Sequence, residues 1–255
     1  MQVQPKKNLG QHFLTDLSIA KNIVDTLSFN SYETVMEIGP GMGVLTQFLL
    51  QKKCKLVLVE IDKESVVYLQ KHFSDGLTIL PADFLKLTLA EYITEPFAVI
   101  GNFPYNISSQ ILFKVLENKH QIPEVVGMFQ KEVAERVCAK PNSKVYGIIS
   151  VLIQYFYEAT YLFTVDETVF NPPPKVKSGV LRLKRKTTIS PIDEKLFFQV
   201  VKTAFNQRRK KLRNAVKSFG IENLDPTIDE FLEKRAEQLS VDDFKTLTEF
   251  IKNRI

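Results

Sequence analysis

Short apolar runs alternate with amphipathic stretches through the first half of the chain. The apolar runs predict buried strands at residues 34–39, 55–60, 77–80, 97–100 and 125–130. The stretches between and after them predict helices at residues 44–49, 63–73, 109–116 and 131–136. Ser18 is expected to be the N-cap of an earlier helix. Strands that alternate with helices are typical of an α/β fold with a parallel sheet.

The pattern changes after a last strand predicted at residues 180–183. From residue 193 onward, apolar residues recur at helical spacing, and helices are expected at about 228–239 and 241–253. We therefore expect a sheet-containing domain of residues 1–185 and a small helical domain of residues 186–255.

The net charge of +5 is concentrated in one segment. Residues 182–217 hold 12 basic and 2 acidic residues, whereas residues 1–181 are almost neutral. A concentrated basic stripe is the electrostatic footprint of a nucleic-acid partner. For a charge run alone, a solvated helix face is the plainer interpretation.

Composition excludes several classes of protein. With 255 residues, 44% of them hydrophobic, the chain is long enough for one large core. Two cysteines and three separated histidines make neither a disulfide framework nor a metal site, so no metal is expected. The polar start and the lack of an apolar run of about 20 residues predict no signal peptide and no membrane helix. We expect a cytoplasmic protein.

Candidate nucleotide-binding residues follow the first three strands. Gly39-Pro40-Gly41-Met42-Gly43 is either a tight turn or a loop that lets the backbone approach a cofactor closely. Glu60 ends the second strand, where nucleotide-binding α/β folds place an acceptor for ribose hydroxyls. Asp83 follows the third strand, and we expect it to contact a cofactor adenine; a helix cap is the alternative.

A string with specific chemistry follows the fourth strand: Gly101-Asn102-Phe103-Pro104-Tyr105-Asn106-Ile107-Ser108. The Asn102 amide oxygen accepts hydrogen bonds, and Pro104 fixes the direction of the Phe103 carbonyl. Tyr105 offers a flat face on which a base stacks. Two acceptors and one aromatic face suit a planar ring with an amino group, such as adenine. An ordinary strand-to-helix turn is the alternative.

Five motifs, in order along the chain, resemble those of the small-subunit (16S) rRNA adenine N6,N6-dimethyltransferase family. They are Leu9–Leu14, the Asn102 string, Gln130–Val133 with Pro141–Gly147, Phe170–Ser178, and Ala204–Asn214. The resemblance implies that S-adenosylmethionine is the cofactor and that small-subunit rRNA in the assembling subunit is the partner. It also implies dimethylation of two adjacent adenosines in a hairpin loop near the 3′ end.

The resemblance further implies roles for individual residues. Residues 1–185 would form a Rossmann-like S-adenosylmethionine-dependent methyltransferase domain, and residues 186–255 an RNA-contacting domain. The implied cofactor-binding residues are His12, Leu14, Gly39, Gly41, Glu60, Ile61, Asp83, Phe84 and Asn102. The implied catalytic residues are Asn102, Phe103, Pro104 and Tyr105. The implied substrate-binding residues are Tyr105, Phe170, Arg208, Arg209, Lys210 and Lys211. The family usually has Asn at position 12, so the role of the His12 side chain stays open.

Three alternatives remain. A large-subunit rRNA methyltransferase of the macrolide-resistance type shares the fold and the Asn-x-Pro-Tyr motif, but the strings at 141–147 and 204–214 favour the small-subunit enzyme. An RNA-binding assembly or transcription factor that has lost catalysis is disfavoured by the intact Glu60, Asp83, Asn102 and Tyr105. The third is a DNA adenine methyltransferase. We expect a monomer, since no exposed apolar heptad is present.

Overall fold

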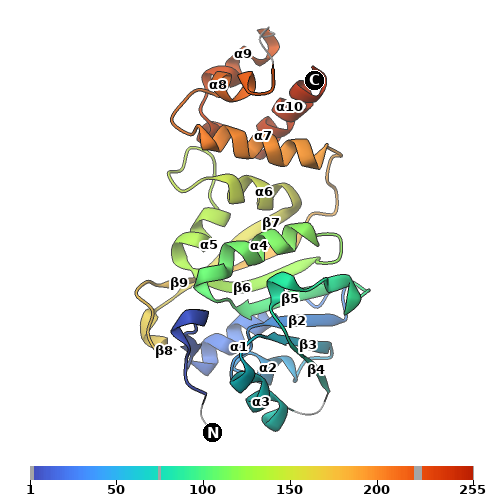
Figure 1. Cartoon of the computed structure of the whole chain (residues 1–255), viewed down its shortest axis with the longest axis vertical. Helices are drawn as coiled ribbons and strands as arrows, with labels where there is room; N and C mark the ends of the chain where they lie inside the picture. The colour runs from blue at the N-terminus through green and yellow to red at the C-terminus, as the bar shows by residue number, and fades with distance from the viewer. Residues whose placement is uncertain (1–2, 74–75, 221–225, 255) are drawn as a thin grey trace. The chain divides into compact units, whose positions relative to one another are not determined.

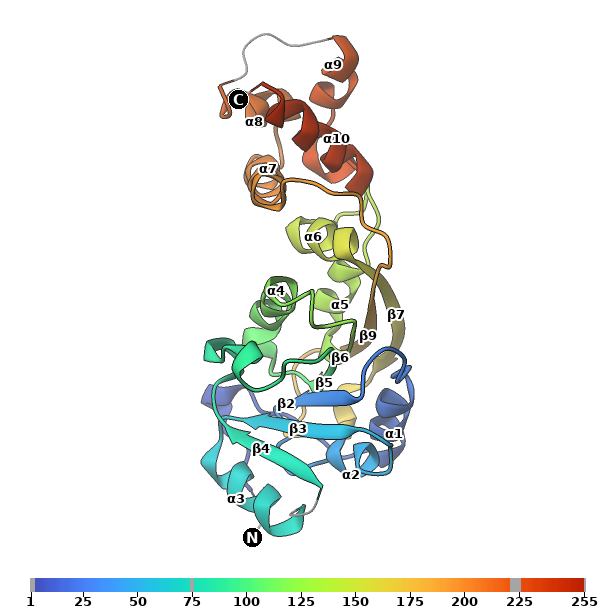
Figure 2. The same cartoon turned by 90° about the vertical axis from the view of Figure 1, so that its right-hand side faces the viewer.

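The computed structural model describes residues 3–73, 76–220 and 226–254, which form two compact units. The first unit comprises residues 1–135 and 158–185, and the second comprises residues 136–157 and 186–255. Figures 1 and 2 show both units. Among the described helices, none is long and apolar enough to cross a membrane.

The first unit is organised around a seven-stranded sheet with the order β4-β3-β2-β5-β6-β9-β7 (Figure 1). The strands are β2 (Thr34–Ile38), β3 (Lys55–Glu60), β4 (Leu77–Pro81), β5 (Phe97–Asn102), β6 (Glu124–Gln130), β7 (Tyr157–Val165) and β9 (Ser178–Arg185). Strands β2, β3, β4, β5 and β6 are parallel to one another, and β9 is antiparallel to β6. The α/β class with a Rossmann-like sheet is confirmed. Strand β7 is an addition that the sequence analysis did not predict.

The strand order reverses between β2 and β5. From β2 the chain continues outward to β3 and β4, and then returns to β5 on the other side of β2. Both β2 and β5 are buried along nearly their whole length, as the apolar runs predicted. In open α/β sheets, ligands bind outside the carboxyl ends of the strands at such a reversal. The loop after Ile38 and the string after Gly101 both start at that point.

Helices cover both faces of the sheet. They are α1 (Leu17–Asp25), α2 (Thr46–Leu49), α3 (Lys63–His72), α4 (Ser108–Glu117) and α5 (Lys131–Val137). Figure 2 shows α1 and α2 on the face opposite α4. The N-cap of α1 is Asp16 and not Ser18, because the Asp16 carboxylate accepts hydrogen bonds from the Ser18 and Ile19 N–H groups at 2.8 and 3.1 Å.

A two-stranded ladder joins the N-terminal arm to a distant loop. Strand β1 (Phe13–Leu14) pairs antiparallel with β8 (Phe170–Asn171). Short 3-10 helices complete the unit: η1 (Lys7–Leu9), η2 (Phe84–Lys86), η3 (Leu89–Glu91), η4 (Tyr105–Ile107) and η5 (Glu167–Val169). The ladder places the arm beside the carboxyl ends of the strands, since Asn102 bonds to its backbone.

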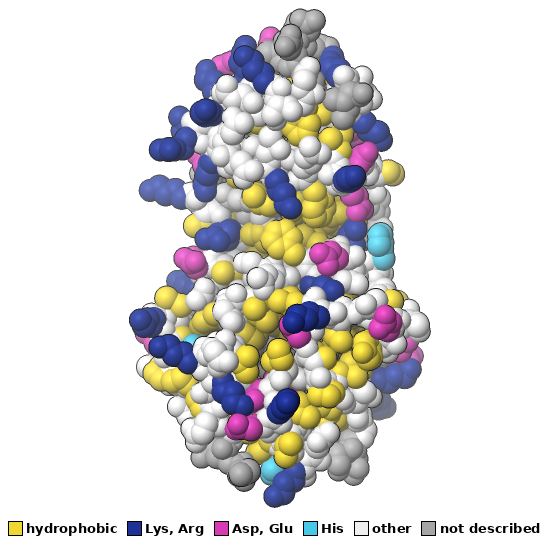
Figure 3. Space-filling view, viewed as in Figure 1, with side chains coloured by type: hydrophobic (Ala, Val, Ile, Leu, Met, Phe, Trp, Pro, Cys, Tyr) yellow, Lys and Arg dark blue, Asp and Glu magenta, His cyan; other side chains and the backbone are white. Residues whose placement is uncertain are grey.

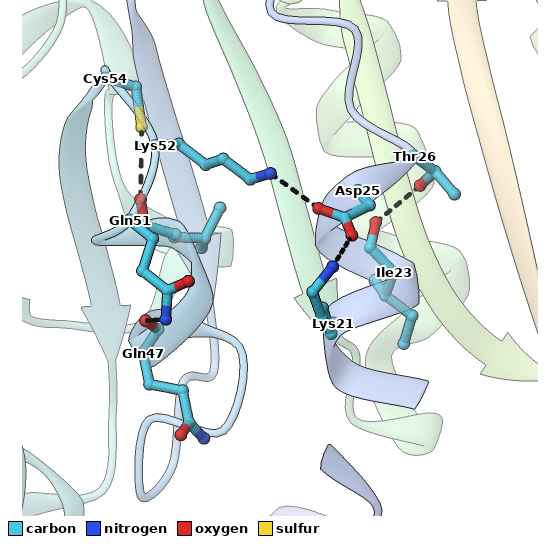
Figure 4. Close-up of polar contacts among 9 residues, drawn as sticks. Lys21, Ile23, Asp25, Thr26, Gln47, Gln51, Lys52 and Cys54 are labelled. Carbon is cyan, nitrogen blue, oxygen red and sulfur yellow. Dashed lines mark hydrogen bonds and ion pairs between the residues drawn. The ribbon is translucent and has the colours of Figure 1, made fainter. Parts of the chain in front are cut away.

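An ion-pair cluster links α1 to the loop after α2 (Figure 4). Asp25 accepts from the Lys21 ammonium at 2.5 Å and from the Lys52 ammonium at 2.7 Å. These two cations lower the pKa of Asp25. The three side chains are a third or more exposed, so solvent screening keeps the contribution to stability small.

Two facing glycines make room for the ring of Phe103. Gly101 in β5 pairs with Gly127 in β6, and a Cβ atom at Gly127 would lie 2.0 Å from Phe103 Cε2. The Phe103 ring is 1% exposed and packs against Phe129 at a centroid distance of 4.9 Å. This packing anchors the chain immediately after β5, which carries the Asn102 string.

The second unit is helical. Its elements are α6 (Ile148–Phe156), α7 (Glu194–Asn206), α8 (Leu212–Lys217), α9 (Pro226–Glu233), η6 (Ala236–Gln238) and α10 (Val241–Lys252). Its core contains aromatic pairs, including Tyr155–Phe197 at 4.7 Å and Phe205–Phe244 at 5.8 Å.

Two expectations about this unit need correction. Residues 136–157, which we placed in the first domain, belong to the second unit because buried α6 packs on α7. The helix expected at 228–239 ends at Glu233. The backbone beyond it bonds to another segment instead: the Leu212 N–H donates to the Lys234 carbonyl at 2.9 Å, and the backbones of Lys211 and Arg235 form an antiparallel β-bridge.

We predict that Gly127→Ala lowers the free energy of unfolding by about 1–3 kcal/mol, because the new methyl group must displace the buried Phe103 ring. Urea unfolding measures this change. Gly147→Ala is the matched control, since the nearest heavy atom to its Cβ is 4.0 Å away and its φ of −163° suits any residue. Equal effects of the two substitutions would contradict the packing role.

Candidate active site

The N-terminal arm fixes the orientation of the Asn102 amide. The Asn102 Nδ2 group donates to the His12 carbonyl oxygen at 2.9 Å, across 90 positions of sequence. A carbonyl oxygen can only accept, so the nitrogen must face His12 and the Oδ1 oxygen must face away from it. Within the described residues, Oδ1 has no hydrogen-bond partner. The backbone of His12 thus has a positioning role, whatever side chain stands at that position.

The next residues place a second acceptor and an aromatic ring. The Phe103 N–H donates to the Met128 carbonyl at 3.1 Å, while no described residue donates to the Phe103 carbonyl. The Tyr105 hydroxyl lies 2.5 Å from Ser178 Oγ. Burial raises the pKa of the Tyr105 phenol, and the bond to Ser178 opposes that rise. Ser178 was not among the predicted site residues; its position at the end of the Phe170–Ser178 motif was the available signal.

The His12 side chain also takes part. Its ring stacks on that of Tyr105 with centroids 5.4 Å apart and an interplanar angle of 28°. Its Nδ1 atom lies 2.7 Å from the Pro172 carbonyl oxygen. The question left open at position 12 therefore has two answers: the backbone holds Asn102, and the imidazole covers part of the Tyr105 ring.

The glycine loop holds the carboxylate of Glu60. Gly39 and Gly41 have φ angles of +66° and +55°, which only glycine adopts without strain. The N–H groups of Gly41 and Asp62 donate to the two Glu60 oxygens at 3.0 and 2.8 Å. Burial raises the pKa of Glu60, and these two donors oppose the rise. The carboxylate is thereby fixed, and its remaining lone pairs are available to a ligand.

Asp83 both caps a helix and lines the pocket, so it combines the two roles that its sequence position suggests. Its Oδ1 accepts from the Leu85 N–H at 3.0 Å, so it caps η2. Its side chain is 28% exposed and lines the same pocket as Glu60. Ile61, beside Glu60, is 52% exposed and lines the pocket too. An exposed isoleucine next to two carboxylates is a surface that a flat base covers well.

One pocket at the carboxyl ends of the parallel strands brings most of the predicted residues together. It is lined by His12, Gly39, Gly41, Glu60, Ile61, Asp83, Phe84, Asn102, Phe103, Pro104 and Tyr105. The fixed acceptors of Glu60, the positive-φ loop and the apolar wall of Ile61 and Phe84 fit the adenosine part of a cofactor. The groups able to hold ribose and adenine therefore lie in the same pocket as the acceptors of Asn102 and Phe103.

Two predicted residues lie elsewhere. Leu14 and Phe170 are each 4% exposed, pair with each other across the β1–β8 ladder, and belong to the hydrophobic core. Leu14 lines only a smaller adjoining cavity that includes Asn102. Phe170 does not line the pocket, and the substrate-binding role that the resemblance implies for it stays a prediction. Buried Phe170 anchors the N-terminal arm to the core through its pairing with Leu14.

The predicted basic residues lie in the second unit between α7 and α8, and they divide into two kinds. Arg208 pairs with Glu237 at 2.6 Å and donates to the Lys144 carbonyl at 2.7 Å, and Lys211 pairs with Glu233. Arg209 and Lys210 are exposed and have no ion-pair partner among the described residues. Dark-blue side chains gather along the left edge of this unit in Figure 3. Only the second pair is free for an external anion.

The sheet, the loop after β2 and the pocket define an S-adenosylmethionine-dependent methyltransferase. The family model "Ribosomal RNA adenine dimethylase" matches residues 2–253. A relative from Cytophaga hutchinsonii, "Ribosomal RNA small subunit methyltransferase A", is 57% identical and is aligned over 99% of each chain. The protein of that name from Flavobacterium johnsoniae is also 57% identical, over 98% of this chain and 97% of its own. The chain belongs to the ribosomal RNA adenine dimethylase family.

Solved structures agree in fold. A dimethyladenosine transferase from Plasmodium falciparum has a TM-score of 0.82 and 26% identity, covering 96% of this chain and 99% of its own. The 23S rRNA methyltransferase ErmE has a TM-score of 0.72 and 23% identity, covering 94% and 99%. The expected family, methyltransferase activity and S-adenosylmethionine as methyl donor are confirmed. The roles of individual residues stay predictions.

A second buried acid lies beneath the glycine loop. Glu37 in β2 is 1% exposed and accepts from the Thr46 hydroxyl at 2.6 Å. Burial raises its pKa from 4.5 to about 8; the Thr46 bond opposes the rise and the Glu60 charge adds to it. Between these two pKa values the folded chain holds a proton that the unfolded chain releases. Stability therefore falls as pH rises from about 4.5 to about 8.

We predict that Glu37→Gln flattens this loss, because glutamine does not titrate and can still accept from Thr46. The difference in unfolding free energy, variant minus wild type, should increase steadily from pH 5 to pH 8. Urea unfolding at several pH values measures it. Exposed Glu91→Gln serves as the control, with a curve parallel to wild type. A parallel curve for Glu37→Gln would show that Glu37 is not protonated in the folded chain.

Proposed function

We propose that the chain transfers methyl groups from S-adenosylmethionine to N6 of two adjacent adenosines in a 3′-end hairpin loop of small-subunit rRNA, in the bacterial cytoplasm, late in subunit assembly. Relatives 57% identical over almost their whole length carry the name small-subunit methyltransferase. One structural observation supports the chemistry most directly. The bond from Asn102 to the His12 carbonyl leaves the amide oxygen free to accept, and Asn102, Phe103 and Tyr105 line the same pocket.

The cofactor would be held by residues from three strand ends. Glu60 would accept from the ribose hydroxyls, Asp83 would accept from the adenine amino group, and Ile61 and Phe84 would pack on the adenine. The positive-φ glycines allow close approach of the backbone. When bound, the cofactor supplies an activated methyl group on a positively charged sulfur. The protein's task is then to position the acceptor nitrogen.

Asn102 and Phe103 prepare the acceptor nitrogen. A loop adenine leaves its stack at modest cost, enters the pocket and stacks on Tyr105. Asn102 Oδ1 and the Phe103 carbonyl accept the two amine hydrogens, which turns the nitrogen lone pair out of conjugation with the ring. The proton leaves from a positively charged product to solvent, so no strong base is needed. After the first transfer, one acceptor loses its hydrogen and must tolerate a methyl group.

The second unit would contact RNA through Arg209 and Lys210, since Arg208 and Lys211 are engaged within the unit. We propose that residues 186–255 carry this RNA-contacting role and that a single chain performs the reaction. The large-subunit alternative has less support, because ErmE shares the fold at only 23% identity. A catalytically silent assembly factor remains the competing function, and methyl transfer distinguishes the two.

The deciding experiment is transfer of labelled methyl groups to small ribosomal subunits that lack the dimethyl marks, with the modified sites mapped. We expect up to four methyl groups on two neighbouring adenosines. Asn102→Ala should lower the rate of transfer at least about a hundredfold, while cofactor affinity stays within a few-fold, because the acceptor acts on the amine and not on the cofactor.

Three outcomes would contradict this account. Transfer only to large-subunit RNA would favour the resistance-type enzyme. Tight subunit binding without any transfer would favour the assembly factor. An equal loss of rate and of cofactor affinity in Asn102→Ala would remove the proposed role of the amide. Calorimetric titration of the cofactor measures the affinity separately from the rate.

We predict that replacing Arg209 and Lys210 together by glutamine weakens RNA binding and lowers the slope of log affinity against log salt by about 1.5, since each phosphate contact contributes about 0.7–0.9. Fluorescence titration over a series of salt concentrations measures the slope. Lys252→Gln, an exposed lysine in α10 of the same unit, is the control and should leave the slope unchanged. An unchanged slope in the double variant would exclude phosphate contacts by these two residues.

A further inference from the structure

A second recess adjoins the pocket in the first unit. It has a volume of about 700 Å³, within the range of small-ligand sites. It shares Gly10, Gln11, His12, Tyr105 and Asn106 with the pocket. The wall that it does not share comes from Pro5, Lys7, Gln130 and residues 172–176. The function proposed above assigns no role to that wall.

The His12 ring stands on the boundary between the two cavities. It stacks on Tyr105, and Nδ1 lies 2.7 Å from the Pro172 carbonyl oxygen, which can only accept. Nδ1 therefore carries the hydrogen, and in the neutral ring Nε2 has a free lone pair. Two contacts therefore hold the imidazole. One is the stack on the Tyr105 ring, and the other is the hydrogen bond to the Pro172 carbonyl in the wall of the recess.

Gln130 is placed to recognise a base. It ends β6 and pairs in register with Ser178, whose hydroxyl holds Tyr105. Its side chain is half-buried, and no described residue makes a hydrogen bond with its amide. An amide offers two donors and an acceptor, which match the polar edge of a nucleobase. The same strand pair thus supports Tyr105 in one cavity and presents a free amide in the other.

Two lysines at the recess differ from their neighbours in sequence. Lys6 pairs with Asp62 and Glu64, and Lys177 pairs with Asp166 at 3.0 Å. In the described ranges, Lys7 and Lys175 are exposed, line the recess and have no ion pair. Of these four lysines, the two without an ion pair are therefore the two that line the recess. Between these lysines, three consecutive prolines (172–174) give a wall that loses little entropy when a ligand binds.

We propose that the second recess binds the RNA nucleotide adjacent to the target adenosine; this inference rests on the function proposed above. The nucleotide linked to a base in the pocket must lie within one phosphodiester link of it, and the shared residues make the recess the adjoining space. Gln130 and His12 Nε2 bond to its base edge, and Lys7 and Lys175 contact its phosphates. The recess therefore acts as a subsite that holds the RNA in register while the target base reacts.

A double-mutant cycle between protein and RNA tests the subsite. Full-length wild type and Gln130→Ala are compared on a methyl-accepting small-subunit RNA and on the same RNA made abasic at the nucleotide 5′ or 3′ to the target. On the intact RNA, we expect Gln130→Ala to raise KM about tenfold with kcat within about twofold. On one of the abasic RNAs, wild type and variant should have the same KM.

A charge variant provides an independent readout. Lys175→Gln should lower the salt slope of RNA binding by about 0.7. Lys184→Gln is the matched control, because Lys184 is exposed and lies opposite Glu124 in the backbone register, at the other end of the β6–β9 ladder from Gln130. Its slope should equal that of wild type, and cofactor affinity should be unchanged in all variants.

The outcomes separate the subsite from the proposed function. If wild type methylates the RNA and Gln130→Ala raises KM by the same factor on intact and on both abasic RNAs, the subsite is refuted and the function stands. If Lys175→Gln and Lys184→Gln have equal slopes, the phosphate contact is refuted. If wild type transfers no methyl group to small-subunit RNA, the proposed function fails and the subsite fails with it.

Discussion

The hydrogen bond from the Asn102 amide to the His12 carbonyl is the contact on which the site depends. It joins the N-terminal arm to the end of β5 and decides which way the amide faces. The arm is in turn held by the β1–β8 ladder, whose Leu14 and Phe170 side chains lie in the core. The end of β5 is held by the Phe103 ring above Gly101 and Gly127. The acceptor group is thus supported from both sides by buried packing.

Burial of carboxyl groups is the second constraint on this region. Glu37 and Glu60 come from adjacent strands, and burial raises the pKa of both. The two buried carboxyl groups differ in the hydrogen-bond donors that they receive. Glu60 is paired with two backbone N–H groups, whereas Glu37 has a single hydroxyl donor and retains its proton near neutral pH. The free energy of unfolding therefore falls as pH rises, and the group responsible lies in the strand that precedes the glycine loop.

Ion pairs, and not the number of basic residues, decide which cations are available to an external partner. In the basic segment, Arg208 and Lys211 are neutralised by Glu237 and Glu233, while Arg209 and Lys210 are left for an external anion. Beside the second recess, Lys6 forms ion pairs with Asp62 and Glu64, whereas Lys7, which lines the recess, forms none with the part of the chain that the structure describes. Glu233 and Glu237 therefore do more than balance the net charge, because they decide which of the four cations at residues 208–211 remain available.

The sequence by itself determined strands β2 to β6 and β9, the place of the glycine loop, Glu60, Asp83 and the Asn102 string after strands, and the family. Those features depend on local periodicity and on short strings, which survive without tertiary information. It missed β7, and it missed α6 because a nearly continuous apolar run shows neither the helix period nor the strand period. Tertiary structure alone decided that Phe170 is core, that Arg208 is an internal partner, and that residues 136–157 join the C-terminal helices. These outcomes depend on which distant residues become neighbours, and no local pattern encodes that.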